Sequence, residues 1–363
     1  MIYKILLLLI FVLGLNANQN VFADAKYYSD NTRELFYLPK VSAEGGADIV
    51  FYKNGSPQSN SALLGIDSAS EISLSYSSYY QNVFSTSIIS YYGMIDERSG
   101  FGISISYLYN PQIPNTEDLD IGNDGHPIYD PTKIKYSSES IIYFHAGYGY
   151  KFIINKRINA GIGISLNATR HKLPFNVFKG YGIGIDAGSI LEFSKIGLRV
   201  ALICDNLTTQ YTKWSNEYSE YAYPHLRFGI GWMREIPYIA GRLMAVYKSL
   251  DILSNEGANT TNMPQLFGAD TQYSAAEQNL NIPQDIPKTA SLFKEPLLYF
   301  LSGNIGVEYM IKDVFSIRFG HNVINNLTFG CGLAVFKKRL IFDFAYLSHE
   351  LAPTYQICVT YKY

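Results

Sequence analysis

The sequence predicts an all-β fold, a transmembrane antiparallel β-barrel of about 14 strands preceded by an N-terminal segment. Three observations predict it. From Glu71 onward, apolar and polar residues alternate with the period of a strand. The connections between these segments are alternately short and long. After the N-terminus, no run of about 20 apolar residues is present that would form a membrane-spanning helix.

Residues 1–23 have the features of a secretory signal peptide. Lys4 supplies a positive charge, Ile5 to Leu15 form a short apolar run, and Val21 to Ala23 form a cleavage site with a small residue at its end. We therefore expect the chain to be exported. Because the apolar run is too short for a spanning helix, strands must hold the protein in a membrane.

The composition argues against a nucleic-acid-binding protein and agrees with a membrane β-barrel. The 29 basic and 31 acidic residues give a net charge of -2, so no basic surface for nucleic acid is expected. Aromatic residues make up 15% of the chain and charged residues only 17%. This balance is typical of strands with one apolar face and aromatic belts at the lipid interfaces, although a large soluble β-sandwich shares it.

Residues 24–70 precede the first strand and are assigned to a separate segment. The part from Leu38 to Asp67 is rich in Gly, Ala, Ser and Asn and is too long for a simple lead-in. It is predicted either to plug the lumen as a hatch or to form a periplasmic contact arm.

Residues 71–363 are predicted to form the barrel. Ile72, Leu74 and Tyr76 illustrate the pattern, since serines occupy the positions between them. Several segments have about ten residues, the length that a tilted strand needs to cross a bilayer. The predicted strands are 71–78, 83–92, 100–109, 140–152, 157–171, 181–194, 196–204, 224–234, 238–248, 299–310, 313–321, 326–336, 339–348 and 354–363.

The connections assign sides to this barrel. Short connections fall at 94–99, 153–156, 194–195, 235–237, 311–312 and 337–338. The long ones, 110–139, 205–223 and 249–298, all fall at the opposite end. Short periplasmic turns and long extracellular loops are typical of the bacterial outer membrane, and an even strand number places both termini in the periplasm. A soluble sandwich gives no reason for this alternation.

The last strand ends in Tyr363 and has an apolar stripe along one face. It resembles the signal that the outer-membrane barrel-assembly machinery reads, and an ordinary amphipathic terminal strand is the alternative. Outer-membrane lipid and this machinery are therefore the first expected partners.

Strand parity assigns a set of charged residues to the lumen. We interpret them as a ladder of paired charges that rigidifies the interior, in preference to a transport path. These residues are Asp186, Glu192, Arg199, Arg227, Arg242, Glu308, Arg318 and Asp343. Glycines on the same face would accept bulky neighbours or a kink. They are Gly182, Gly184, Gly229, Gly231, Gly330 and Gly332.

The first long loop contains a weak candidate for a calcium site. Asp118, Asp120 and Asp124 lie close together before Gly125, but the spacing is not that of an EF-hand and no bidentate Glu follows. An acidic surface loop is the alternative interpretation.

Other residues with reactive side chains show no motif. Cys204, Cys331 and Cys358 lack a CxxC spacing and are interpreted as packing residues. The histidines have no zinc-binding spacing, and no Gly-x-Ser-x-Gly sequence is present. We expect no cofactor and no enzymatic activity, with a barrel hydrolase kept as a minor alternative.

Five stretches together resemble the PorV/PorQ-like outer-membrane proteins, which belong with the FadL-type long-chain fatty-acid transporters. The stretches are 45–48, 54–64, 71–76, 344–351 and 361–363. The family carries an Asn-Pro-Ala-Asn/Gly-Leu motif in its hatch, and here Asn60, Ala62 and Leu64 match while the proline is lost. The resemblance implies a barrel of about 14 strands with an N-terminal hatch.

The resemblance implies two different roles. PorV-like members act in type IX secretion and bind partners at the cell surface, whereas FadL-like members take up hydrophobic molecules through a lateral opening. Because balanced charge fills the predicted lumen and the outer loops are long, the sequence favours the first role, with secretion-system proteins bound through loops such as 249–298. A transporter for long-chain fatty acids or other hydrophobic small molecules is the alternative.

Overall fold

The computed structural model describes residues 33–51, 56–67, 70–115, 118–120, 128–217, 219–236, 241–252, 296–301, 303–322, 327–349 and 351–363. The predicted signal peptide lies outside these residues. Within them, fourteen strands pair with their neighbours in antiparallel register and close into a ring, since β5 pairs with both β4 and β6 and β1 pairs with β16. The predicted 14-stranded barrel is confirmed, and the sandwich alternative is excluded.

The ring contains β1 to β7 and β10 to β16. Its first half is β1 (Glu71–Tyr79), β2 (Phe84–Met94), β3 (Ser99–Asn115), β4 (Lys135–Asn155), β5 (Ile158–Lys172), β6 (Lys179–Phe193) and β7 (Leu198–Asp205). Its second half is β10 (His225–Ile236), β11 (Gly241–Lys248), β12 (Asn304–Ile311), β13 (Phe315–His321), β14 (Thr328–Val335), β15 (Leu340–Leu347) and β16 (Thr354–Lys362).

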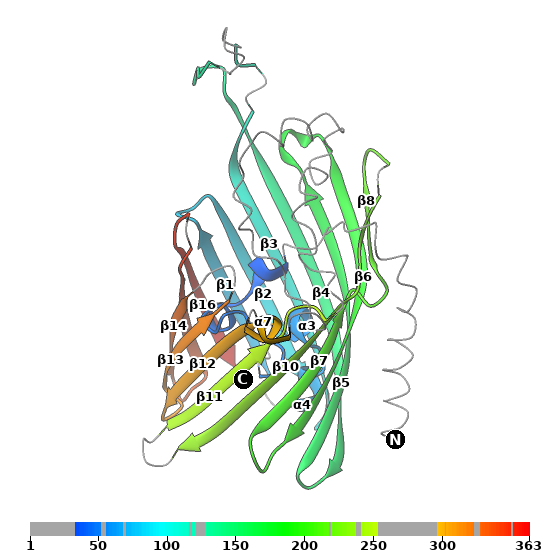
Figure 1. Ribbon diagram of the computed structural model, residues 1–363, viewed down its shortest axis with the longest axis vertical. Coiled ribbons are helices and arrows are strands. Elements are labelled where there is room, and N and C mark those ends of the chain that lie inside the picture. Colours follow the sequence, from blue (N-terminus) through cyan, green and yellow to red (C-terminus); the bar gives the residue numbers. More distant parts are fainter. Residues whose placement is uncertain are drawn as a thin grey trace.

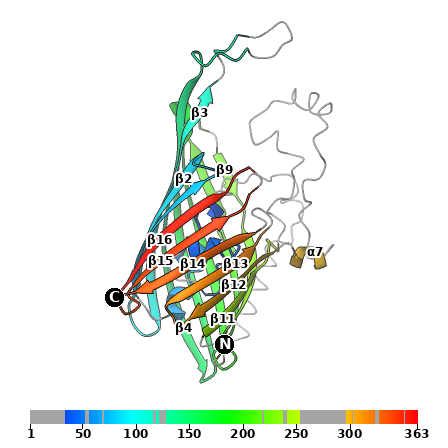
Figure 2. The same cartoon turned by 90° about the vertical axis from the view of Figure 1, so that its left-hand side faces the viewer.

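The wall is tall on one side and low on the other, as Figures 1 and 2 show, because β3 to β6 have 15 to 21 residues and β11 to β16 have seven to nine. The predicted long loop 110–139 is therefore partly wrong: β3 runs to Asn115 and β4 starts at Lys135. This part of β3, which contains Pro111 and Pro114, pairs only with β4, across a bulge between Asn110 and Ile113.

Two further corrections concern the other long connections. The predicted loop 205–223 contains a short hairpin, β8 (Gln210–Trp214) and β9 (Ser219–Ala222). Its strand β8 pairs with residues 180–183 of β6, and neither hairpin strand belongs to the ring of fourteen. The predicted strand 299–310 starts only at Asn304, since the short helix α7 (Pro296–Leu301) precedes it. The apolar residues of α7 do not alternate with polar ones as in a strand. The predicted strand was wrongly extended into this apolar run.

Outward and inward faces follow the predicted parity. Along β3, Ile103, Ile105 and Tyr107 are exposed, whereas Ser104 and Ser106 between them are buried inside the barrel. The outer face is therefore apolar, as contact with lipid requires. None of the helices in the described part of the chain is long and apolar enough to cross a membrane.

The segment before β1 lies inside the ring and packs on its inner face (Figure 1). It is called the hatch below and comprises residues 33–67 as far as they are described. Its short helices are η1 (Arg33–Phe36), α2 (Pro39–Ser42), α3 (Ser56–Ser59) and α4 (Leu63–Ile66), and η2 (Pro174–Asn176) lies in the β5–β6 connection. Pro39 starts α2 because its fixed backbone angle suits the first helical position.

The turn after α2 depends on glycine. Gly45 and Gly46 have φ angles of 66° and 80°, a left-handed conformation that side chains disfavour. A Cβ on Gly45 would also overlap with the backbone of His321. The two glycines therefore let the hatch turn while touching the wall.

Candidate functional site

The residues of the hatch motif hold the hatch against the wall. Asn60 is fully buried, its Nδ2 donates to the Ile49 carbonyl oxygen at 2.8 Å, and its Oδ1 accepts from the Ala62 backbone N–H at 3.0 Å. Ala62 and Leu64 are also fully buried, and the Leu64 carbonyl accepts from the Tyr92 hydroxyl at 2.7 Å. Asn60 therefore joins two parts of the hatch to each other, and Leu64 joins the hatch to β2.

The wall beneath this motif is lined with glycine. A Cβ on Gly163 would overlap with the backbone of Ser61 and Ala62, and a Cβ on Gly188 would overlap with the Asn60 side chain. Gly100, Gly149 and Gly161 make similarly close contacts with residues 61–66. The hatch thus rests directly on the backbone of β3 to β6, where a larger side chain would leave it no room.

The six glycines singled out from the sequence divide into two groups. Gly229, Gly231 and Gly330 make room for the side chains of Ile49, Phe51 and Ala43 of the hatch, which agrees with the predicted acceptance of bulky neighbours. The others, Gly182, Gly184 and Gly332, face polar side chains of the wall itself.

We expect Asn60→Ala to lower the free energy of unfolding by about 1–3 kcal/mol, because it leaves the Ile49 carbonyl and the Ala62 N–H buried without a partner. Urea unfolding of the folded barrel in lipid vesicles measures this. Asn155→Ala is the matched control, since Asn155 also accepts from backbone N–H groups but lies at the exposed end of β4. Equal losses in the two variants would contradict a special role for Asn60.

Arg318 is the centre of a buried charge cluster that joins wall and hatch. Its Nε donates to Glu308 and its Nη1 to Asp343, both at 2.6 Å, and Glu44 of the hatch lies 3.5 Å from Nε. The Arg318 and Glu44 side chains are 2% and 0% exposed, so solvent does not screen the cluster. One guanidinium thus binds two wall carboxylates and one hatch carboxylate.

Two further cations connect wall and hatch. Arg199 of β7 pairs with Glu192 of β6 at 2.7 Å and with Asp67 of the hatch at 3.0 Å. Lys248 of β11 pairs with Asp48 at 3.2 Å and donates to the Tyr37 hydroxyl at 2.6 Å. Both contacts tie wall strands to the hatch in a buried, low-dielectric environment.

The fourth cluster lies where the hatch begins. Arg33 pairs with Asp186 at 3.1 Å and with Asp205 at 3.3 Å, and Arg227 pairs with Asp205 at 2.8 Å. Asn167 donates to the same Asp186 carboxylate. Arg33 therefore links the first described turn of the hatch to β6 and β7.

The structure places the eight predicted lumen charges in several separate clusters. Glu192 pairs with Arg199, and Arg318 pairs with Glu308 and Asp343. These ion pairs join neighbouring wall strands, as the interpretation as a ladder of paired charges expects. Asp186 pairs with Arg33, and Arg227 pairs with Asp205. Arg242 pairs with Asp313, which lies in the β12–β13 turn.

Sequence reasoning missed the hatch partners Arg33, Glu44, Asp48 and Asp67, and the wall residues Asp205 and Lys248. Parity on β7 and β11 would have found Asp205 and Lys248, which face inward like Arg199 and Met244. No local pattern marks the hatch residues, because they lie in short irregular turns.

An apolar cluster on the inner wall was not expected from the predicted charged lumen. Ile88 of β2, Leu108 of β3, and Ile141 and Tyr143 of β4 face inward and are at most 5% exposed. The Phe36 ring of the hatch packs edge-on against Tyr143 at a centroid distance of 5.1 Å. We call this group, with Leu38 and Cys358, the lumen cluster.

The candidate calcium loop is only partly described. Asp118 pairs with Lys135 and Asp120 with Lys133, each at 2.6 Å, whereas Asp124 lies outside the described residues. The hydrogen bond from Lys135 lowers the pKa of the exposed Asp118. No group of three His, Cys, Asp or Glu side chains suited to a metal ion occurs in the described ranges. The calcium site stays a prediction.

The cysteines are free thiols. Cys204 and Cys358 are buried and Cys331 is half-buried, with Cys358 in the lumen cluster.

No family model and no curated protein matches this chain. Solved structures do. The toluene transporter TodX from Pseudomonas putida has a TM-score of 0.51 and 11% identity, over 90% of this chain and 97% of that one. A TodX mutant described as a monoaromatic hydrocarbon channel has a TM-score of 0.50 and 11% identity, over 90% and 98%. A FadL homologue from Pseudomonas aeruginosa reaches 0.45 at 9% identity, over 89% and 98%.

The likeness shows the fold. It is a closed antiparallel β-barrel like that of TodX. The FadL-type resemblance and the bacterial outer membrane as the location stay predictions. Nothing in the comparisons supports the PorV/PorQ part.

Proposed function

We propose that this protein is an outer-membrane transporter for small hydrophobic compounds, with the lumen cluster as the site where they bind. The cluster carries the proposal, because the inner face of an outer-membrane barrel is ordinarily polar and here four neighbouring wall residues are large and apolar. Apolar and aromatic linings are the common feature of sites for small hydrophobic molecules.

The position of the lumen cluster supports this function. Its wall residues lie on β2 to β4, and the hatch covers them with Leu35, Phe36 and Leu38. The hatch fills the space that a ligand would take, so binding requires η1 to move or the ligand to replace the Phe36 ring. Hydrogen bonds from Tyr79 and Gln58 to the Leu35 and Phe36 carbonyl oxygens hold this turn in place.

The comparisons also favour transport, which was the alternative at the sequence level. Two matching structures with a TM-score of at least 0.5 are of TodX, described as a toluene transporter and as a monoaromatic hydrocarbon channel. The PorV-like surface role rested on the balanced lumen charge and on the long outer loops. Of the loop 249–298, residues 253–295 lie outside the described residues. Long loops at the cell surface, and periplasmic termini, stay predictions.

Replacing Ile88 with threonine tests the proposal. The variant keeps the branched shape but places a hydroxyl in the lumen cluster, and burying a hydroxyl next to an apolar ligand costs about 1–3 kcal/mol. We expect the affinity of the purified protein for radiolabelled toluene to fall by about tenfold, which corresponds to about 1.4 kcal/mol.

Ile190→Thr is the matched control. Ile190 is an inward-facing isoleucine with the same 2% exposure, but it belongs to a second apolar cluster with Val41 and Ile49 of the hatch. The two variants should lose similar stability, whereas only Ile88→Thr should lose toluene affinity. Toluene bound equally by both variants, or not bound by the wild type, would contradict the proposed function.

A further inference from the structure

A shallow pocket of about 480 Å³ lies on the outside of the barrel at the short-turn end. Phe336, Lys337 and Arg339 of the β14–β15 turn line it, together with Leu340 of β15 and Tyr361 of β16. Leu340 and Tyr361 pair in register, and Tyr361 is exposed on the outer face. The pocket, called the turn pocket below, therefore belongs to the outer surface of the barrel and not to its lumen.

Aromatic rings continue from the turn pocket along the same end of the barrel. Tyr361 lies beside Tyr363 at a ring-centroid distance of 6.4 Å, and Tyr363 lies beside Tyr91 of β2 at 6.3 Å. Tyr91 in turn contacts Phe101 of β3 at 5.4 Å. In membrane barrels, aromatic rings gather where the apolar core of the bilayer meets its headgroups. This row of rings places the turn pocket at the level of the lipid headgroups.

An apolar surface leads from the turn pocket toward the long-loop end. Phe342 and Val359 form the next outward-facing register pair of β15 and β16, and both are exposed. Ile357 follows on the same face of β16. The acyl chain of a lipid whose headgroup lies in the turn pocket would contact these side chains.

The two cations of the turn pocket are available to an anion from outside the chain. Lys337 and Arg339 are both exposed. Within the described part of the chain neither forms an ion pair, the C-terminal carboxylate of Tyr363 included. An ammonium and a guanidinium side by side match a phosphate group, to which both bind through charge-assisted hydrogen bonds.

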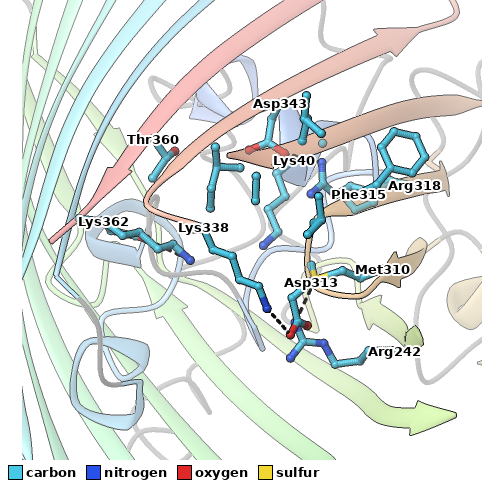
Figure 3. Close-up of a pocket in the computed structure, with 17 residues that line it drawn as sticks. Lys40, Arg242, Met310, Asp313, Phe315, Arg318, Lys338, Asp343, Thr360 and Lys362 are labelled. Carbon is cyan, nitrogen blue, oxygen red and sulfur yellow. Dashed lines mark hydrogen bonds and ion pairs between the residues drawn. The ribbon is translucent and has the colours of Figure 1, made fainter. Parts of the chain in front are cut away.

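Two carboxylates of neighbouring strands and turns are bound by other cations. Figure 3 shows Lys338 extending from its turn to Asp313, at 3.0 Å, and Arg242 reaches the same carboxylate at 3.3 Å. Glu71 of β1 lies 3.9 Å from Lys362. These carboxylates therefore leave the charges of the turn pocket without a counter-ion from the chain.

The low side of the wall gives these cations a reason to reach lipid headgroups. β14 and β15 have eight residues each and β16 has nine, whereas a tilted strand needs about 9–11 residues to cross a bilayer. A short apolar band draws the headgroups toward the strand ends, where long basic side chains extend to meet them.

From this arrangement we propose that the turn pocket binds the headgroup of one anionic phospholipid, with its phosphate between Lys337 and Arg339. The Arg339 guanidinium donates two parallel hydrogen bonds to phosphate oxygens, and the Lys337 ammonium adds a point charge. An anionic headgroup fits better than a zwitterionic one, whose own ammonium already compensates the phosphate. The proposal rests on the membrane location in the proposed function but not on transport.

Native mass spectrometry of the purified full-length protein in non-ionic detergent tests the proposal. We expect dioleoyl phosphatidylglycerol to bind about tenfold more tightly than dioleoyl phosphatidylcholine, since each cation near a lipid surface favours an anionic headgroup. Soluble glycerol 3-phosphate should bind much more weakly than the lipid, because it lacks the acyl chains. Equal affinity for the two lipids would overturn the proposal. Glycerol 3-phosphate binding as tightly as phosphatidylglycerol would also overturn it, because the site would then bind a free phosphate.

The double variant Lys337→Gln/Arg339→Gln should lose about tenfold in affinity for phosphatidylglycerol. Its affinity for phosphatidylcholine and its unfolding midpoint should not change. Lys156→Gln/Arg157→Gln is the matched control. It removes one lysine and one arginine from the exposed β4–β5 turn at the same end of the barrel, outside the turn pocket. An equal loss in the two double variants would show general attraction between charges and would overturn the proposal.

A second measurement uses the wild type in vesicles. Lys337 should react more slowly with a water-soluble amine-reactive reagent in phosphatidylglycerol vesicles than in phosphatidylcholine vesicles, whereas Lys156 should differ much less, as quantified by mass spectrometry. Equal protection of the two lysines would also contradict a lipid bound in the turn pocket. The toluene test concerns the lumen cluster, so either proposal can fail without the other.

Discussion

Arg318→Ala is expected to lower the free energy of unfolding by about 3–5 kcal/mol, because it removes the cation from a buried cluster of three carboxylates. Glu308 and Asp343 would then face each other and Glu44 at 5% exposure or less, with Lys40 as a remaining nearby cation. Urea unfolding in lipid vesicles, followed by tryptophan fluorescence, measures the loss.

Two comparisons make this expectation specific. Lys338→Ala removes a half-exposed partner of Asp313 and should cost no more than about 1 kcal/mol. Adding Glu308→Gln and Asp343→Asn to Arg318→Ala should restore part of the lost stability, since the uncompensated charges are then gone. A loss in Arg318→Ala no larger than in Lys338→Ala would show that the cluster does not hold the hatch.

Gly163→Ala should dislodge the hatch from the wall. The new Cβ would overlap with the backbone of Ser61 and Ala62, which cannot rotate away as the end of a side chain can. We expect a stability loss of about 1–3 kcal/mol and a higher single-channel conductance in planar bilayers. The conductance is the more informative measurement, because overpacking elsewhere in the barrel would change only the stability.

Gly182→Ala provides the comparison. Gly182 lies on the neighbouring strand β6 and also faces inward, but its Cβ would meet the hydroxyls of Thr169 and Thr212, which can turn aside. Its conductance should stay at the wild-type level. If Gly163→Ala and Gly182→Ala conduct alike, the hatch is not seated on β5 as described.

The strands were predictable because their signal is local. In β1, serine alternates with Ile72, Leu74 and Tyr76, and the predicted strand 71–78 differs from the observed one by a single residue. Antiparallel neighbours joined by short turns pair in the only register that keeps both apolar faces outward. The errors arose where the alternation of apolar and polar residues stops. These places are the extensions of β3 and β4 and the β8–β9 hairpin, which lie beyond the apolar outer band of the barrel.

The sequence predicted which wall residues face inward but not what they meet. Parity along β13 places Arg318 inside, yet Glu44, which joins its cluster, is 274 residues earlier and lies in an irregular turn. The hatch motif was predicted from Asn60, Ala62 and Leu64, while the contacts of this segment with Gly163 and Gly188 were not predicted. Such contacts depend on the path of the hatch through the barrel, which no local pattern encodes.

The sequence by itself therefore determined the barrel, its strand number and which side chains of the predicted strands face inward, because alternation along a strand needs no knowledge of distant residues. Only the tertiary structure decided how the interior is used. It placed the hatch on a glycine-lined wall, joined hatch and wall through buried charges, and left an apolar lumen cluster. These features combine residues far apart in the chain, and their chemistry exists only once the ring has closed.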